Sequence, residues 1–291
     1  MTRPVYPICP SFKDGELELE SIKKYLRYLD KEGATRVLTT AGTSQFNLLS
    51  VKEIFYLNRA LVKHFTKEKI LGLPIQSLKH TLKEVKALNN LKADNTSILI
   101  IFPERYYNDN QIVNYFKIIC NASNYPVYVH GNPIRKGNGG VYEYSNELLS
   151  KLSKIDNFKG MKEEYSSIDL AMKCIQDLDL DIIVAGGSMR RFWLLNSYGA
   201  SSFLTGIGSF YPEYSEYFYD SIINNRLTSA RSIIEKYEKQ FFNVFMSIGW
   251  HACMREGLKY KGFLLENREP FHILNEQDKL TVIKTLKLIK E

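Results

Sequence analysis

The sequence is poor in cysteine, and the few cysteines that it has are isolated. Its 291 residues include four, Cys9, Cys120, Cys174 and Cys253, which stand far apart without CxxC or Cys/His spacing. Four such residues are too few for a disulfide framework and lack the ligand spacing of a metal site. We therefore expect a protein of a reducing cytoplasm that carries no metal.

Long apolar runs and phosphate-binding loops are also missing. No run reaches the roughly 18 apolar residues that span a bilayer, and no basic, apolar and small-residue leader opens the chain. Neither GxGxxG nor GxxxxGK followed by Ser or Thr occurs, so the Gly-x-Gly at 206–208 does not indicate a nucleotide site. We expect neither secretion nor membrane insertion, and no nucleotide cofactor.

Basic residues are only slightly more numerous than acidic ones. The formal net charge is +7, from 39 basic and 32 acidic residues, and the lysines are scattered along the chain without an arginine-rich block. This distribution indicates a solvated basic surface, so we expect no nucleic-acid partner. An anionic small-molecule substrate is compatible with the charge.

The sequence does contain a regular alternation of strand-length apolar clusters and longer amphipathic segments, and 44% of its residues are apolar. This alternation is typical of βα units around a parallel sheet. The predicted strands are residues 5–9, 36–39, 70–72, 97–101, 126–130, 158–161, 181–184 and 202–205. The predicted helices between them are residues 18–33, 51–65, 78–90, 111–122, 144–153, 168–176 and 189–196, with caps at Ser50 and Ser145. Eight strands predict an α/β fold, a closed (β/α)8 barrel.

After residue 212 the pattern becomes wholly helical, through residues 213–224, 228–243, 247–257 and 275–289. No tether or repeat sets this part off from the rest. We therefore predict a (β/α)8 barrel over residues 1–212 and a C-terminal helical extension over residues 213–291 that packs on the barrel.

Three segments carry the residues to which we attribute chemistry. Residues 158–164 read Phe-Lys-Gly-Met-Lys-Glu-Glu, a short strand that ends near Lys162. Residues 128–135 read Tyr-Val-His-Gly-Asn-Pro-Ile-Arg, and residues 41–46 read Ala-Gly-Thr-Ser-Gln-Phe. A lysine near the end of a buried strand is costly to desolvate unless its amine reacts. Taken alone, Lys162 would more simply pair with Glu163 or Glu164.

Together these segments resemble the dihydrodipicolinate synthase and N-acetylneuraminate lyase family of Schiff-base aldolases, and the resemblance covers essentially the whole chain. The family's GIKE pattern appears here as Gly160-Met161-Lys162-Glu163. The resemblance implies that Lys162 attacks a pyruvate-type keto acid, loses water and leaves an iminium that stabilises a carbanion at the adjacent carbon. It implies a lyase, aldolase or synthase that forms or cleaves a C–C bond and needs no cofactor.

The resemblance also implies roles for Gly42, Thr43 and Ser44. In the family a Gly-Thr-Thr-Gly-Glu loop binds the carboxylate of the keto acid through backbone N–H groups and hydroxyls. Thr43 is therefore a catalytic candidate, and Gly42 and Ser44 are substrate-binding candidates. Gly42 replaces the family's first threonine, which in dihydrodipicolinate synthases passes protons between two tyrosines. The alternative is a set of strand-end residues without a role in catalysis.

His130 stands where the family's Tyr-Asn-x-Pro motif has its proton-shuttling tyrosine, and Pro133 and Arg135 keep the register. An imidazole exchanges protons near neutral pH, so we predict that His130 is a catalytic acid–base group; the alternative is a structural histidine. Tyr128 lies two residues earlier on the same face of the strand and is a candidate to stand in for the missing phenol.

Four more residues receive substrate-binding roles from the resemblance. Arg135 matches the arginine that clamps the carboxylate of the second substrate, and Tyr107, with Tyr106, approximates a tyrosine that reaches across a subunit interface. Gly186 lies in a glycine-rich turn after the seventh strand, and Ile207 follows the eighth strand. The family also implies a homotetramer or a dimer.

The second substrate is implied to be an aldehyde or a sugar acid. Two alternatives stay open: a keto-deoxy sugar-acid dehydratase that uses the same imine, and a non-catalytic keto-acid-binding relative that has lost the proton relay. Because Gly42 and His130 both depart from the family's relay, we predict that the chain is not an efficient dihydrodipicolinate synthase.

Overall fold

The computed structural model describes residues 3–40, 42–74, 76–101, 108–131, 136–137, 140–141, 143–271 and 273–290, with the backbone alone at 136–137 and 140–141. Eight strands form the main sheet, in the order β1-β4-β5-β6-β7-β10-β11-β12. They are β1 (Val5–Pro7), β4 (Arg36–Leu38), β5 (Glu68–Leu73), β6 (Thr96–Ile101), β7 (Val127–His130), β10 (Phe158–Glu163), β11 (Asp181–Val184) and β12 (Ala200–Phe203). All eight predicted strands are present, and helices alternate with them along the chain. The predicted (β/α)8 barrel with C-terminal helices is confirmed.

The chain groups into two compact units. The first runs to Val5 and resumes at Glu68–Leu204; the second holds Tyr6–Lys67 and the chain from Thr205 onward. The predicted boundary between a barrel and a helical extension at residue 212 stays a prediction.

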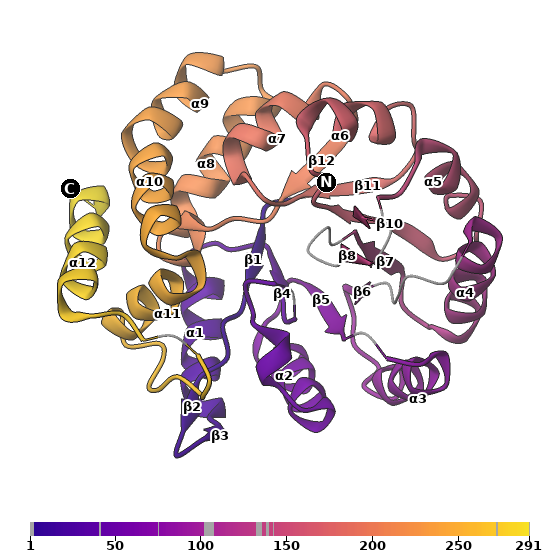
Figure 1. The fold of residues 1–291 in the computed structure, drawn as a ribbon, viewed down its shortest axis with the longest axis horizontal. Coiled ribbons are helices and arrows are strands. Elements are labelled where there is room, and N and C mark those ends of the chain that lie inside the picture. The colour runs from indigo at the N-terminus through magenta and orange to yellow at the C-terminus, as the bar shows by residue number, and fades with distance from the viewer. Residues whose placement is uncertain are drawn as a thin grey trace. The chain divides into compact units, whose positions relative to one another are not determined.

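The first unit contains the parallel strands β5, β6, β7, β10, β11 and β12, each paired with the next, and Val5 forms a parallel bridge with Leu204. Figure 1 shows its helices along the outer side of these strands. They are α3 (Leu78–Asn89), α4 (Asp109–Ala122), α5 (Asn146–Leu152), α6 (Ile168–Ile175) and α7 (Ser188–Asn196). Strands β6 and β11 are buried along their whole length, as expected of parallel strands covered on both faces.

The register of the strands positions the candidate site. Lys162 on β10 pairs with His130 on β7 and with Ile183 on β11. His130 is the last residue of β7, and Glu163 is the last residue of β10. These side chains therefore lie at the carboxyl ends of parallel strands, where (β/α)8 enzymes bind their substrates.

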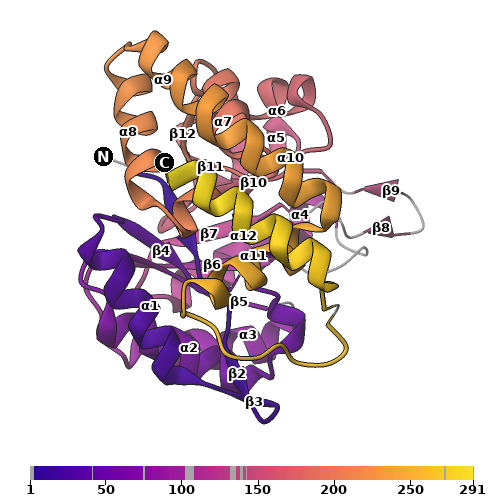
Figure 2. The same ribbon diagram turned by 90° about the vertical axis from the view of Figure 1, so that its left-hand side faces the viewer.

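The second unit contains the end of β1, all of β4 and the short strands β2 and β3, and is otherwise mainly helical. A hairpin of β2 (Phe12–Lys13) and β3 (Glu16–Leu17) precedes α1 (Leu19–Lys31), and α2 (Val51–His64) follows β4. The later helices are α8 (Pro212–Ile223), α9 (Leu227–Ile233), α10 (Lys239–Ile248), α11 (Trp250–Tyr260) and α12 (Glu276–Lys290). Figure 2 shows α10 and α12, in orange and yellow, packed side by side.

Two predicted caps are confirmed. The Ser50 hydroxyl accepts a hydrogen bond from the N–H of Glu53 and forms a capping box with that residue at the start of α2. The Ser145 hydroxyl accepts from the N–H of Leu148 at the start of α5. No helix in the described segments is both long and apolar enough to cross a bilayer.

The structure differs from the prediction at short or irregular elements. The hairpin β2–β3 and the two-residue pair β8 (Lys136–Gly137) and β9 (Gly140–Val141) were not predicted, because two-residue strands leave no readable alternation. The helix predicted to begin at residue 247 begins at Trp250. Gly249, with φ 142°, ends α10 in a conformation that other residues rarely adopt.

Candidate active site

Three polar side chains of the first unit meet at the ends of β7 and β10. The amine nitrogen Nζ of Lys162 lies 2.6 Å from Nε2 of His130 and 3.3 Å from Oε2 of Glu164. The same Nε2 lies 3.0 Å from Oε2 of Glu164. Glu164 directly follows β10, and its contact with Lys162 shows that the alternation of side chains along the strand continues for one residue beyond its end. The three atoms form a closed triangle of hydrogen-bonding contacts.

Burial makes these contacts strong. The side chains of Lys162 and His130 are 2% and 0% exposed, whereas that of Glu164 is 27% exposed. Burial alone raises the pKa of the Glu164 carboxyl, but the charge of Lys162 and the hydrogen bond and charge of His130 outweigh it and bring the pKa to about 2. Glu164 is therefore a carboxylate at neutral pH, and the arrangement can move a proton between the lysine amine and the imidazole.

Glu163, between Lys162 and Glu164, points to the other side of the strand. It is fully buried, and its two carboxylate oxygens accept from Nε and Nη2 of Arg191 on α7, at 2.9 Å each. Nη2 of Arg191 also donates to the carbonyl of Tyr165. This bidentate ion pair fixes the end of β10 against α7, and so positions Lys162 without touching it.

Gly186 lies against Glu164 in the turn between β11 and α7. Its φ is 65°, a left-handed conformation that favours glycine, and a Cβ built on it would lie 3.5 Å from Cγ of Glu164. The predicted substrate-binding residue thus borders the Lys162, His130 and Glu164 cluster.

Tyr128 does not join this cluster. Its hydroxyl donates to a carboxylate oxygen of Asp181, the first residue of β11, and Ser201 donates to the other oxygen. Tyr128 pairs with Gly160, two residues before Lys162, so it lies deeper along the strands. The suggestion that Tyr128 stands in for the family's phenol is therefore wrong, because its hydroxyl is held in a network at the amino end of β11.

In the second unit, the loop after β4 holds the predicted carboxylate-binding residues. The carbonyl of Gly42 accepts from the N–H of Gln45, which closes a turn. Ser44 is fully buried, and its hydroxyl has no hydrogen-bond partner among the described residues. The hydroxyl of Thr43 accepts a hydrogen bond from the indole N–H of Trp250, at 3.4 Å. A buried hydroxyl without a protein partner is a position that a polar ligand can satisfy.

Arg255 on α11 holds this loop in place. Its guanidinium is buried and donates to the carbonyl of Pro10 at 2.7 Å, to the carbonyl of Glu266 at 2.8 Å and to the side chain of Gln45 at 3.2 Å. Gln45 has a left-handed φ of 51°. The guanidinium therefore supports an unfavourable backbone conformation directly after Ser44.

Ile207, also predicted to bind substrate, begins a buried 3-10 turn, Ile207–Ser209. The Thr205 hydroxyl accepts from the N–H of Gly208 at 3.0 Å and bonds the hydroxyl of Ser215 on α8. The backbone after β12 is therefore pinned by hydrogen bonds in the second unit.

Two predicted site residues, Arg135 and Tyr107, lie outside the described residues, as does Tyr106. Three positions of interest were not predicted: Arg191, Trp250 and Arg255. Glu164 was considered only as a simple ion-pair partner of Lys162, and the structure places its carboxylate 3.3 Å from that amine. The period of two along the strand was a signal for Glu164. No sequence signal connects Arg191 with Glu163, Trp250 with Thr43 or Arg255 with Pro10, which lie 28, 207 and 245 residues away.

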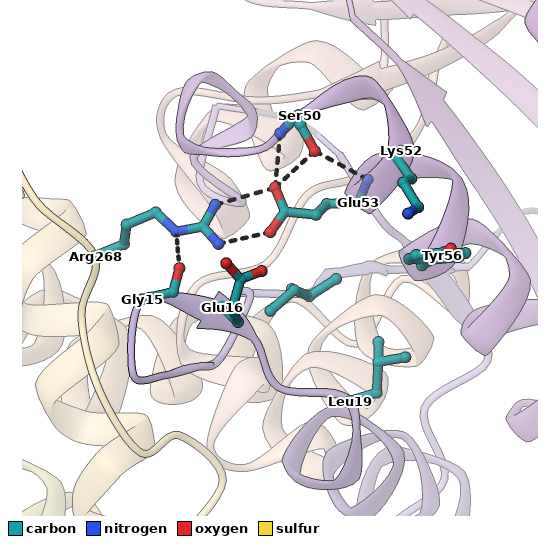
Figure 3. Close-up of a pocket in the computed structure, with 9 residues that line it drawn as sticks. Gly15, Glu16, Leu19, Ser50, Lys52, Glu53, Tyr56 and Arg268 are labelled. Carbon is teal, nitrogen blue, oxygen red and sulfur yellow. Dashed lines mark hydrogen bonds and ion pairs between the residues drawn. The ribbon is translucent and has the colours of Figure 1, made fainter.

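A pocket of about 460 Å³ lies elsewhere in the second unit, between the β2–β3 hairpin and the start of α2 (Figure 3). In it, Arg268 donates to both carboxylate oxygens of Glu53, at 3.0 and 2.6 Å, and to the carbonyl of Gly15 at 2.8 Å. The guanidinium of Arg268 and the carboxylate of Glu53 are thus engaged with each other, and we interpret these contacts as structural. Among the described residues, no group of three or more histidine, cysteine or acidic side chains is arranged to hold a metal ion.

Two 4-hydroxy-tetrahydrodipicolinate synthases illustrate the similarity, which extends over nearly the full length of this chain. The 4-hydroxy-tetrahydrodipicolinate synthase of Thermosipho africanus is 25% identical over 286 residues, covering 96% of each chain. That of Lactobacillus acidophilus is 21% identical, over 97% of this chain and 89% of the relative.

Solved structures share the fold. Dihydrodipicolinate synthase from Thermotoga maritima superposes with a TM-score of 0.86 at 21% identity, covering 100% of this chain and 99% of that one. The enzyme from Acinetobacter baumannii, solved in complex with pyruvate, gives a TM-score of 0.86 at 19% identity and covers 99% and 98%. The Dihydrodipicolinate synthetase family matches residues 4–289. The chain therefore belongs to the dihydrodipicolinate synthetase family of enzymes.

Proposed function

We propose that this enzyme forms or cleaves a C–C bond of a pyruvate-type keto acid through a Schiff base on Lys162, with an aldehyde or a sugar acid as the second partner. One observation carries the proposal: the buried amine of Lys162 lies 2.6 Å from an imidazole nitrogen that can take its proton. A buried amine in contact with a base is the arrangement that nucleophilic catalysis by lysine requires.

The proton balance of imine formation fits these residues. A keto group and a lysine ammonium give an iminium and one water, so two ammonium protons must reach the departing oxygen. His130 takes a proton from nitrogen, and the amine attacks the carbonyl carbon as the C=O π bond breaks. The imidazolium then protonates the oxygen, and a second such transfer releases water as the C–O bond breaks.

The remaining roles come from the resemblance. Gly42, Thr43 and Ser44 would bind the keto acid's carboxylate, and the hydroxyl of Ser44, which has no hydrogen-bond partner among the described residues, supports this role. Arg135 would bind the second partner, and Gly186 and Ile207 would border the substrate. The iminium itself accepts the electron pair of the carbanion, so the reaction needs no metal and no organic cofactor.

Borohydride trapping tests the proposal. Incubation with pyruvate and borohydride should add a reduced pyruvyl group to Lys162, located by peptide mass spectrometry. Lys162→Ala should remove the label and abolish turnover. Lys159→Ala is the matched control, because Lys159 is an exposed lysine of the same strand and its loss should leave the label intact. Labelling at other lysines, or none at saturating pyruvate, would contradict the proposal.

Substrate screening then identifies the reaction. A dehydratase and an aldolase share the imine, so trapping does not separate them. Purified protein should be assayed with keto-deoxy sugar acids for loss of water and with pyruvate plus aldehydes for C–C bond formation. A protein that binds keto acids without trapping at Lys162 and without turnover would instead be a non-catalytic relative.

A further inference from the structure

Glu164 has no role in the resemblance, although it contacts both residues to which we assign the chemistry. We propose that Glu164 is the catalytic counter-ion of this site: its carboxylate stabilises the imidazolium that forms when His130 takes the proton of Lys162. Lys162, His130 and Glu164 then act as one proton-transfer unit. This inference rests on the proposed function, in which Lys162 forms the imine.

The geometry allows two proton arrangements of equal net charge. In the first, the ammonium of Lys162 donates to Nε2 of His130 at 2.6 Å and to Oε2 of Glu164 at 3.3 Å. In the second, the proton has moved to Nε2, which donates to Oε2 of Glu164 at 3.0 Å, and the amine of Lys162 is neutral. A carboxylate can only accept, so Glu164 is a suitable partner in both arrangements.

The second arrangement contains the nucleophile, and it depends on Glu164. An imidazolium in a site where the His130 side chain is 0% exposed is costly unless an opposite charge is paired with it. Its hydrogen-bonding contacts place two charged groups against it, Lys162 from β10 and Glu164 beyond the end of β10, and the turn before α7 contributes the uncharged Gly186 beside Glu164. Glu164 therefore determines how often Lys162 is found as the free amine.

Glu164 is also the member of the unit that reaches solvent. It is 27% exposed, whereas the side chain of Lys162 is 2% exposed. Gly186, with its φ of 65°, lines the same carboxylate without placing a side chain beside it. The carboxylate is thus the solvent-facing member of the unit, and its low pKa of about 2 keeps it ionised throughout the neutral range.

The test measures the rate of pyruvate labelling at Lys162 with saturating cyanoborohydride between pH 5 and 9. Glu164→Gln keeps the shape and removes the charge. We expect the maximal labelling rate to fall about tenfold to a hundredfold, toward the lower range for a positioned acid–base group. The acid limb of the profile should move to lower pH by about one unit, because loss of a neighbouring negative charge disfavours protonation of a cationic unit.

Two further variants complete the design. Glu164→Asp retains the charge, so the acid limb should stay at its wild-type position while the maximal rate falls. Glu147→Gln removes an exposed carboxylate on α5, where it pairs with Lys151, and should leave rate and profile unchanged. Circular dichroism and thermal melts establish that each variant is folded.

The outcomes separate the two proposals. If the wild-type protein labels at Lys162 but Glu164→Gln labels at the same rate with an unmoved acid limb, Glu164 is not the counter-ion and the imine proposal stands. A lower rate with an unmoved acid limb in Glu164→Gln would also reject the counter-ion role, since a purely structural side chain produces that result. If wild-type protein does not label, the proposed function itself fails.

Discussion

Lys162 and His130 face each other on paired strands, with Nζ and Nε2 2.6 Å apart, so that an amine and an imidazole share one buried site. A histidine with only a structural role could pack against apolar neighbours and would need no contact with the lysine amine. Direct contact with a buried lysine instead makes its ring the base nearest to the amine.

The first prediction concerns His130. His130→Ala should slow turnover by about 10²–10⁴-fold, the usual range for loss of a positioned acid–base group. Wild-type activity should fall as the pH drops through the range in which an imidazole takes up a proton, because the protonated ring no longer accepts from Lys162. Steady-state rates against pH measure both effects. Turnover at the wild-type rate in His130→Ala across the pH range would remove His130 from the mechanism.

The second prediction concerns the reaction of the named relatives. The chain should turn over pyruvate and aspartate semialdehyde poorly, because Gly42 lacks the relay hydroxyl and His130 replaces the phenol. Each departure plausibly costs about 10²–10⁴-fold. The double variant Gly42→Thr with His130→Tyr should raise this rate above that of either single variant. A high rate in the unaltered protein would mean that imidazole chemistry alone supports the relatives' reaction.

The third prediction concerns the ion pair behind the site. Arg191→Ala leaves the carboxylate of Glu163 buried without its partner and should destabilise the fold by about 3–5 kcal/mol. Arg191→Met combined with Glu163→Gln removes both charges and should be more stable than Arg191→Ala. Urea denaturation followed by circular dichroism measures these free energies. An equal free energy of unfolding for Arg191→Ala and wild type would show that the ion pair between Arg191 and Glu163 does not stabilise the fold.

The fourth prediction concerns acid stability through Glu53. Hydrogen bonds from Arg268 are the largest effect on its carboxyl and hold the pKa at about 2, against an ordinary value of 4.5. A carboxyl whose pKa is lower in the folded state stabilises the fold above pH 4.5 and loses this contribution as the pH falls toward 2. The melting temperature of Glu53→Gln should therefore lie below that of wild type at pH 7 and approach it near pH 2. A difference in melting temperature that does not change with pH would contradict this account of the pair.

The eight strands were predictable because their apolar clusters are strand-length and separated by amphipathic segments, a local pattern that parallel burial imposes. The helices were predictable on similar grounds, and Ser50 and Ser145 marked two of their starts. The two-residue hairpins were not predictable, since a pair such as Phe12–Lys13 is too short to carry a period. Gly249 interrupts a helical pattern through its backbone conformation, which composition alone does not reveal.

The sequence by itself determined that Lys162 stands near the end of a buried strand, but it left Glu163 and Glu164 as equal partners for the amine. Only the tertiary structure separates them. At the end of β10, Glu163 points toward Arg191 on α7, Glu164 in the next position contacts Lys162, and the neighbouring strand supplies His130. The partner of a charged group depends on which elements pack beside it. Arg191 lies 28 residues from Glu163 along the chain, so no local pattern could assign it. His130 was predicted for this site from its motif, but its contact with Lys162 depends on the pairing of β7 with β10.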